Sequence, residues 1–430
     1  MKFLHIADVH IGCWRNKAMR SLSVKAFEEV CSVAVNEDVD FVVLSGDLFH
    51  TALPSINFVK QVFKNLRKLK EERIRLYYIA GSHDYSPTGK TMLDIIEEAD
   101  LGVNVTKGQV REDGVLKLQF VEDKGTRCKL TGIAGKAGML DQKDYYDLDR
   151  AHLEDVDGKK IFLFHTALDE LLTKELSAMS SSSASFLPKG FEYYAGGHVH
   201  IQRDIAMEDY QNVVYPGPLF PTTFKEIEEL EEGRYVLYED GEVTHKTLQL
   251  KPVVSKSISF ESTSPENIFR LVKEAFEGVG VEDSIVTIRL KGDLVGGSIG
   301  DIDFNTVYTE LLERGAYHVM RSTAGISTES FDAEVVGDRE QEEIEKDLIA
   351  EHSGQIETRF ADEEKVTKNL FKDWNVEKQE GETNSEYEDR VIGVADTIMT
   401  SSENASNQNN SEEKINKEAD KESDLTSFME

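Results

Sequence analysis

Residues 41–50 read FVVLSGDLFH, an apolar run that leads into glycine, aspartate and histidine. Four more stretches have the same form: an apolar, strand-like run is followed by a short cluster of His or Asp side chains. The five clusters contain Asp8 and His10, Asp47 and His50, His83 and Asp84, His165, and His198 and His200. Open α/β sheets bind ligands at the carboxyl ends of their strands, and mixed His and Asp ligation suits manganese or zinc. The sequence therefore predicts one metal centre at the edge of a sheet.

The first 250 residues alternate between strand-like runs and amphipathic helices. Apolar residues recur at helical spacing in 23–36 and 54–72. Residues 236–238 and 243–244 flank Glu239-Asp240-Gly241, which is a hairpin signal. This alternation predicts a layered α/β domain over residues 1–250.

Three regions follow this domain. Residues 251–335 carry strands and helices in an order similar to βαββαβ, which predicts a small α+β domain. Residues 336–399 have the apolar stripes of three short helices. Residues 400–430 are rich in Ser, Asn, Glu and Lys, which predicts a disordered acidic tail.

The charge is unevenly distributed. The chain of 430 residues has a net charge of −32. Residues 1–200 carry 26 basic and 29 acidic side chains, whereas residues 201–430 carry 23 and 52. Such acidity argues against a general nucleic-acid coat, because phosphate binding depends on Lys and Arg. It does not exclude a nuclease, since the half with the histidine clusters is nearly neutral and metal ions supply positive charge.

The sequence also predicts an intracellular protein outside membranes. Cys13, Cys31 and Cys128 have no paired spacing and are typical of reduced thiols. The first strand begins at the N-terminus and leaves no room for a signal peptide. No run of about 18 apolar residues is present.

The clusters fit a two-metal phosphoesterase centre, in which paired ions clamp a phosphodiester and activate a water. Asp47 is the natural bridging carboxylate, because it has two oxygens to share. Asp8 and His10 are two residues apart, which places both on one side of an extended segment, and His198 and His200 repeat that spacing. Histidines outside the clusters are interpreted as surface or satisfied core residues: His5, His152, His245, His318 and His352.

The ordered motifs resemble those of calcineurin-like metallophosphoesterases over about residues 1–220: D-x-H, G-D, G-S-H-D in place of G-N-H-D, a lone H, and G-H-x-H. Within that superfamily, the chain is similar to the nuclease subunit of the DNA double-strand-break repair complex, of the meiotic-recombination-eleven or SbcD type, and above all to its archaeal members. Leu48-Phe49-His50 after the G-D motif, residues 81–87 and Tyr215-Pro216-Gly217 carry this closer resemblance.

The resemblance implies a fold and a set of ligands. The fold would be a metallophosphoesterase β-sandwich flanked by helices, with a small α+β capping domain and C-terminal helices. One ion would be bound by Asp8, His10, Asp47 and His200, and the other by Asp47, Ser82, His165 and His198. His83 would protonate the leaving group or stabilise the transition state, and His50 would support it. Asp84 would orient His83 through a hydrogen bond, as outer-shell carboxylates do.

Two positions depart from the family pattern. Ser82 stands where the superfamily usually has Asn, and a hydroxyl is a shorter and weaker oxygen ligand than an amide carbonyl. The second ion would then bind loosely or through water. Pro218 stands where Ser usually follows Gly217, which concerns loop geometry more than chemistry.

The implied activity is a manganese-dependent nuclease with two Mn²⁺ per subunit, acting as a 3′–5′ exonuclease and single-strand endonuclease on DNA ends and single strands. The implied partner is an SMC-like coiled-coil ABC-type ATPase, and the implied location is cytoplasmic and nucleoid-associated. One alternative is a metallophosphatase or cyclic-nucleotide phosphodiesterase that uses the same ions. Another is a repair scaffold whose second metal site has decayed at Ser82.

Two interfaces are also implied. The family forms homodimers through segments that match residues 54–72 and 91–99, although both apolar faces could simply pack on the sheet. The C-terminal stripes would dock on the ATPase, or else fold back on the capping domain. These stripes contain Leu370, Phe371 and Trp374, and Tyr387, Val391, Val394 and Ile398.

Overall fold

The computed structural model describes residues 1–86, 91–136, 140–171, 181–328, 390 and 393. Met1–Glu329 forms one compact unit. The predicted helices of residues 336–399, apart from two isolated positions, and the predicted tail of residues 400–430 lie outside the described residues. Within the described part of the chain, no helix has the length and apolar character needed to cross a bilayer.

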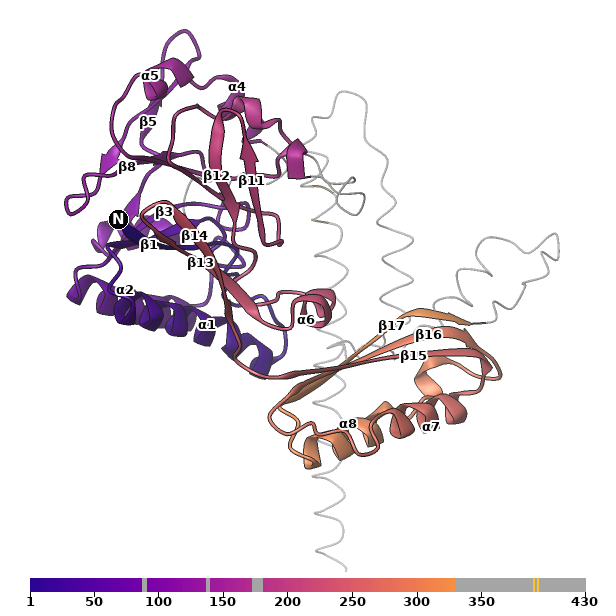
Figure 1. The fold of residues 1–430 in the computed structure, drawn as a ribbon. Helices are drawn as coiled ribbons and strands as arrows, with labels where there is room; N and C mark the ends of the chain where they lie inside the picture. The colour runs from indigo at the N-terminus through magenta and orange to yellow at the C-terminus, as the bar shows by residue number, and fades with distance from the viewer. Residues whose placement is uncertain (87–90, 137–139, 172–180, 329–389, 391–392, 394–430) are drawn as a thin grey trace, which may run out of the picture. The chain divides into compact units, whose positions relative to one another are not determined.

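The first six-stranded sheet has the order β14-β13-β1-β2-β3-β4. Figure 1 labels four of its strands, β1, β3, β13 and β14. Its strands are β1 (Lys2–Ile6), β2 (Phe41–Ser45), β3 (Arg75–Ile79), β4 (Val103–Asn104), β13 (Gly233–Glu239) and β14 (Glu242–Leu248). The first four run parallel, and β13 and β14 form the predicted hairpin through the Asp240-Gly241 turn. The carboxyl ends of β1, β2 and β3 therefore lie at the same edge.

The second six-stranded sheet has the order β11-β12-β10-β9-β8-β7. Its strands are β7 (Val121–Glu122), β8 (Lys129–Gly132), β9 (Lys160–His165), β10 (Tyr193–Gly197), β11 (Arg203–Met207) and β12 (Tyr210–Tyr215). Strands β8, β9, β10 and β12 are parallel. A separate hairpin joins β5 (Gly108–Val110) to β6 (Leu116–Leu118).

The two sheets pack face to face, with helices outside. Residues alternate along each strand, so Phe3 and Phe41 enter the core between the sheets while Leu4 and Val42 face the outer helices. The outer helices of the first sheet are α1 (Lys17–Asn36), α2 (Ile56–Glu71) and α3 (Met92–Glu98). The second sheet is covered by α4 (Gln142–Tyr146) and α5 (Arg150–Glu154), with the 3₁₀ turns η2 (Asp169–Leu171) and η3 (Ala184–Phe186) nearby in sequence. This arrangement confirms the predicted fold class, a metallophosphoesterase-like sandwich flanked by helices.

A smaller α+β layer follows residue 250. Its elements are β15 (Val253–Thr263), α7 (Pro265–Ala275), β16 (Ile285–Leu294), η4 (Ile299–Asp301), α8 (Phe304–Glu313) and β17 (His318–Thr328). All three strands are parallel and share one core with the two helices. The comparison with a βαββαβ order was wrong, because the layer has three strands and its order is βαβαβ.

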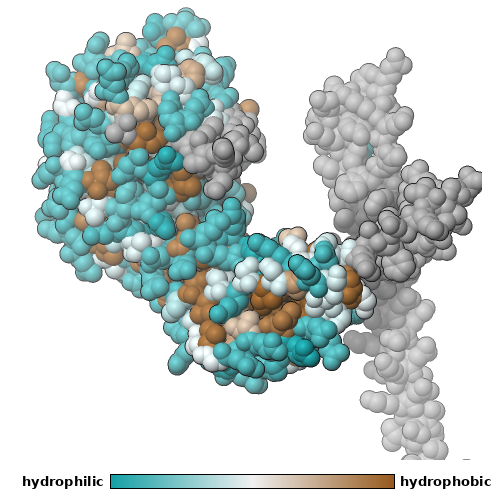
Figure 2. Space-filling model, turned by 45° about the vertical axis from the view of Figure 1, so that its right-hand side comes forward, coloured by the Kyte–Doolittle hydropathy of each residue, from teal (hydrophilic) through white to brown (hydrophobic). Residues whose placement is uncertain are grey.

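The face of the molecule in Figure 2 is mostly hydrophilic, as the high content of charged residues leads one to expect. Few large apolar side chains of the described residues are exposed: Leu53, Ile56, Ile95, Val110, Leu140, Tyr146 and Leu312.

Candidate metal centre

Side chains from both sheets converge on one point. Three groups of potential ligand atoms each lie within 4.8 Å of one another among the described residues. These groups are Asp8, His10 and His200; Asp8, Asp47 and His165; and His10, His50 and His83. The five strand ends singled out in the sequence therefore meet at a single edge of the sandwich, as predicted.

The remaining two predicted ligands lie at the margin of these groups. The ring of His198 is 5.2 Å from the ring of His165, measured between centroids. The hydroxyl of Ser82 lies 3.5 Å from Asp47 Oδ2. The structure thus places both beside the centre, although neither belongs to the three groups of ligand atoms.

Burial divides the centre into an enclosed floor and an open side. Asp8, Asp47, His10 and His165 are at most 2% exposed. His50 and His200 are half-buried, whereas His83 is exposed. A bound substrate would therefore approach from the side of His83.

The backbone at the strand ends is strained. Asp8, His10, Asp47 and His198 all have positive φ, between 45° and 86°. Non-glycine residues rarely adopt this conformation, and such strain concentrates at functional sites. The unusual backbone turns each side chain sharply as its strand ends, towards the shared centre.

Backbone donors hold the two central carboxylates. Asp47 Oδ1 accepts a hydrogen bond from the N–H of His83 at 2.8 Å. Asp8 accepts from the N–H of His198 at 3.0 and 3.2 Å. Gly81 is required for this approach, because a Cβ there would collide with the backbone nitrogen and side chain of Asp47. The carboxylates are thus fixed before any ligand binds.

The second nitrogen of two histidines is also engaged. The Nδ1–H of His165 donates to the carbonyl oxygen of Ser45 at 2.7 Å, which leaves its buried Nε2 3.2 Å from Asp47 Oδ2. His200 Nδ1 lies 3.0 Å from Glu226 Oε1, and its Nε2 faces the centre, 3.1 Å from His10 Nε2. Such partners fix the ring orientation and tautomer of metal-binding histidines. Aligned imidazole nitrogens around two carboxylates fit a divalent cation of borderline to hard character.

The charge balance of the centre supports this fit. Burial raises the pKa of Asp47, but the nearby imidazoles of His165 and His10 outweigh it, so the pKa lies below its usual range. Burial lowers the pKa of His198 to about 4 and that of His10 well below 6.5, so both are neutral at pH 7 and can donate a lone pair. Against the effect of burial, Asp47 raises the pKa of His165 to about 10. A cation bound at this point would displace that proton.

Glu226 is a functional candidate that the sequence interpretation missed. It lies on α6 (Phe224–Leu230), where the Thr223 hydroxyl accepts from the Glu226 N–H at 3.2 Å. Thr222 donates to the Glu226 carboxylate through its N–H at 2.7 Å and its hydroxyl at 3.0 Å. The T-x-x-E spacing signals a helix start, but only the fold shows that the carboxylate also reaches His200.

Asp84 does not have the role predicted for it. Its carboxylate makes no hydrogen bond to the His83 ring; it accepts from the backbone N–H groups of Leu48, Phe49 and Gly81 at 3.0–3.1 Å. Asp84 is 1% exposed. It therefore ties the loop after β3 to the loop after β2, and the prediction that it orients His83 was wrong.

The His83 ring is oriented by His50 instead. His83 Nδ1–H donates to the backbone carbonyl of His50 at 3.0 Å. The two rings are stacked with centroids 4.8 Å apart, and the His10 ring meets His83 edge-on at 4.7 Å. This pairing leaves His83 Nε2 free to exchange a proton at the open side.

As predicted, His5 is a satisfied core residue, hydrogen-bonded to Tyr193 Oη and Ser45 Oγ at 2.9 Å each.

We expect replacement of Ser82 by Asn to lower the manganese concentration needed for half-maximal activity. An amide carbonyl reaches farther than a hydroxyl and is a better oxygen donor to a hard cation. Manganese titration of Ser82→Asn against the unchanged chain measures the effect, with Ser86→Asn in the same loop as the control. An unchanged titration curve would mean that residue 82 is not a ligand and that water fills the position.

Comparison with known proteins agrees with this geometry. Residues 1–202 match the family model described as calcineurin-like phosphoesterase. A protein of Archaeoglobus fulgidus named DNA double-strand break repair protein Mre11 is 28% identical over 66% of this chain and 62% of its own length. Proteins of the same name from Thermoplasma acidophilum and Sulfurisphaera tokodaii are 28% and 31% identical, over 72% and 47% of this chain and 79% and 49% of their own lengths. The chain thus spans somewhat under two thirds of the Archaeoglobus relative that it matches.

Proposed function

We propose that this chain is a metal-dependent nuclease that processes the ends of broken DNA. The observation that carries the proposal is the convergence of imidazoles and carboxylates around Asp47 from both sheets, with an exposed histidine at the open side. The name shared by the relatives favours a DNA-repair substrate over other phosphoesters. Such a substrate would place the protein inside the cell, near the nucleoid.

The proposed ligands divide into two sets that share Asp47. Asp8, His10, Asp47 and His200 would hold one Mn²⁺, and Asp47, Ser82, His165 and His198 the other. When bound, the ions would polarise the phosphodiester and lower the pKa of an attacking water. Ser45 and Glu226 would keep the His165 and His200 rings aligned through their Nδ1 atoms.

His83 would act on the leaving group. Protonated His83, positioned by the His50 carbonyl, would donate the Nε2 proton to the 3′ oxygen as it leaves the phosphorus. His50 would support the His83 ring by stacking and would contact the scissile phosphate from the same side. The exonuclease and endonuclease activities would both use this one centre. The presence or absence of a free DNA end at the centre would decide which of the two reactions takes place.

One assay tests the proposal. The purified chain should degrade linear duplex DNA and cut single-stranded circles in Mn²⁺, and chelation should stop both reactions. A generic phosphomonoester and a cyclic nucleotide serve as matched substrates. Faster hydrolysis of either small substrate would instead support a phosphatase or cyclic-nucleotide phosphodiesterase, and DNA binding without hydrolysis in any divalent ion would support a scaffold.

We also propose that the chain forms a homodimer through the N-terminal end of α2 and through α3. Leu53, Ile56 and Ile95 are 74%, 82% and 47% exposed, whereas Leu93 and Ile96 are buried in the core and unavailable. Exposed apolar side chains that cluster on one surface mark interfaces. Ile56→Glu should therefore yield a monomer by light scattering at micromolar concentration, while Val110→Glu, at a residue 68% exposed elsewhere, should not. A monomeric unchanged protein would contradict the dimer.

The C-terminal region is proposed to dock an SMC-like coiled-coil ATPase. The support is the sequence alone: short apolar stripes on acidic segments need a surface on which to bury them. Deletion of residues 360–400 should abolish co-purification with the ATPase and leave manganese-dependent cleavage of single-stranded DNA intact. Full binding by the truncated chain would refute docking, and its unfolding would favour packing on the capping domain.

A further inference from the structure

Basic side chains gather where α2 ends and β3 begins. Residues 60–75 carry seven basic and two acidic side chains, in a chain whose net charge is −32. The surface considered next, termed the α2–β3 basic surface, consists of six of these residues, all exposed: Lys64, Arg67, Lys68, Lys70, Arg73 and Arg75. It lies on the side of α2 opposite the buried Val62, Leu66 and Leu69, and continues onto the first residue of β3.

Most of this charge is not neutralised by the protein. Within the described residues, only Lys68 and Lys70 form ion pairs, with Glu28 at 3.6 Å and with Asp100 at 2.7 Å. Asp100 is 84% exposed, and exposed pairs of this kind contribute little free energy and exchange partners readily. The cations available to an anionic partner are therefore Lys64, Arg67, Arg73 and Arg75. Release of Lys70 from Asp100 would add a fifth at a small cost in free energy.

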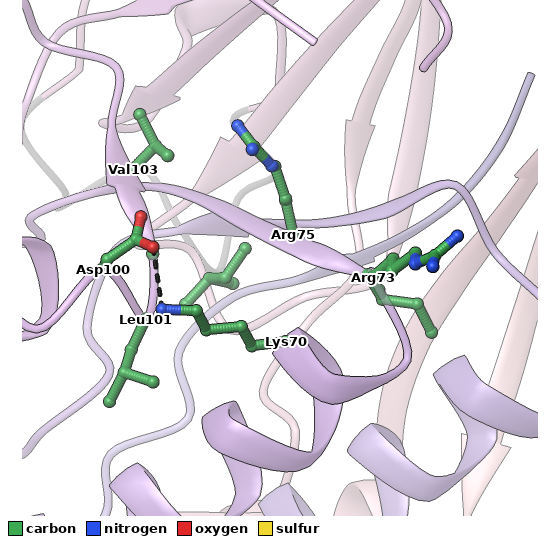
Figure 3. A pocket seen from close by; sticks show the side chains of 9 residues that line it. Lys70, Arg73, Arg75, Asp100, Leu101 and Val103 are labelled. Carbon is green, nitrogen blue, oxygen red and sulfur yellow. Dashed lines mark hydrogen bonds and ion pairs between the residues drawn. The ribbon is translucent and has the colours of Figure 1, made fainter. Parts of the chain in front are cut away.

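Part of the surface is hollow. A cavity of about 240 Å³ is lined by Lys70, Arg73, Arg75 and Asp100, together with the uncharged residues Ile74, Leu76, Leu101, Gly102 and Val103. Figure 3 shows the side chains of Lys70, Arg73 and Arg75 around it, with Lys70 turned towards Asp100. Guanidinium groups bind phosphate oxygens in a bidentate manner, so this hollow suits a phosphate group.

Arg73 stands at a position that favours glycine. It follows the end of α2 with φ 65°, and the N–H groups of Arg73 and Ile74 donate to the carbonyls of Lys70 and Leu69. This is the hydrogen-bond pattern of a helix end closed by a left-handed residue, where glycine is favoured because a Cβ makes that conformation strained. The arginine thus adds charge at a position where the fold alone would favour a smaller residue.

We infer that the α2–β3 basic surface binds the phosphate backbone of DNA away from the site of cleavage. This inference rests on the proposed nuclease function. The loop before α2 carries Asp47 and His50, so α2 leads from the metal centre to this surface. Sixteen helical residues span about 24 Å, which corresponds to about seven nucleotides of one strand at about 3.4 Å each. DNA whose end reaches the metal centre could therefore contact both places at once.

A charge-reversal experiment tests the inference. Arg67→Glu with Arg73→Glu should weaken binding of a duplex of about 25 base pairs about tenfold or more, and should reduce the slope of log affinity against log salt by about 2. Cleavage of a hairpin of about six base pairs, too short to reach the surface, should be unchanged. Lys117→Glu with Lys246→Glu makes the same change in charge at two exposed lysines elsewhere and should leave duplex affinity closer to that of the unchanged chain.

The outcomes separate this inference from the proposed function. Equal loss of duplex affinity in both double variants would mean that only overall charge matters, and would overturn the inference. Tighter duplex binding by the Arg67/Arg73 variant would also overturn it. That result would mean that the partner of the surface is the acidic segment 329–430 and not DNA. This segment carries 30 acidic and 11 basic side chains. Failure of the unchanged chain to cleave the short hairpin would instead count against the nuclease proposal.

Discussion

Replacement of His83 by alanine is expected to lower the rate of DNA cleavage about 10²–10⁴-fold while both Mn²⁺ ions still bind. His83 is exposed at the open side of the centre, and its Nδ1 is occupied by the His50 carbonyl. Its ring contributes none of the atoms that surround Asp47; only its backbone N–H donates there. Loss of the ring therefore removes the proposed proton donor and leaves the Asp47 carboxylate anchored.

The measurement has two parts. Single-turnover cleavage in saturating Mn²⁺ gives the chemical rate, and electron paramagnetic resonance of free Mn²⁺ gives the number of ions bound. His152→Ala, a histidine on α5 outside the centre, is the matched control. A His83 variant that cleaves at the normal rate would remove His83 from the mechanism. A His83 variant that no longer binds Mn²⁺ would identify His83 as a metal ligand instead of a general acid. His50→Ser should reduce exonucleolytic turnover less severely.

The position of the centre was predictable because each cluster of candidate ligands follows a strand. Apolar runs such as residues 41–45 and 161–164 are long enough to be strands and too short to be buried helices. Because β1, β2 and β3 are parallel, their ends lie at one edge of the first sheet, and the ends of β9 and β10 lie at one edge of the second. The packing of the two sheets then brings these two edges together. Local pattern and topology therefore agree on Asp8, Asp47, His165 and His200.

The hydrogen-bond partners of these candidate ligands were not predictable in the same way. Glu226 lies 26 residues beyond His200, and no spacing rule connects the two. The carbonyl of Ser45 that orients His165 is a backbone group, which leaves no trace in the sequence. Such contacts depend on how α6 and the two sheets pack, and so they appear only in the folded structure.

Asp84 shows how proximity in sequence can mislead. It is adjacent to His83, so a hydrogen bond between the two side chains was the natural expectation. A residue in a turn, however, directs successive side chains in different directions. Here Asp84 turns inward under the loop while His83 turns to the surface. The Asp84 carboxylate therefore supports the site through hydrogen bonds to backbone N–H groups and not through a contact with the His83 ring.

Replacement of Asp84 by alanine is accordingly expected to destabilise the fold and the metal centre together. Three backbone N–H groups, of Leu48, Phe49 and Gly81, would lose their acceptor in a buried place. An unsatisfied buried donor costs about 1–3 kcal/mol, so the free energy of unfolding should fall by about 3 kcal/mol or more. Asn should cost less than Ala, because its amide oxygen can still accept.

The effect should reach metal binding because these donors flank the loop that carries the candidate ligand Asp47. Leu48 follows Asp47 directly, and Gly81 packs against the Asp47 backbone, so loosening either displaces the shared carboxylate. Urea unfolding and Mn²⁺ titration should therefore both shift in Asp84→Ala. Asp157→Asn, at an exposed aspartate, should change neither. Normal metal affinity in a destabilised Asp84→Ala protein would show that the two loops hold Asp47 without this link. Normal stability would mean that the three N–H groups find other acceptors, and that Asp84 does not join the loops after β2 and β3.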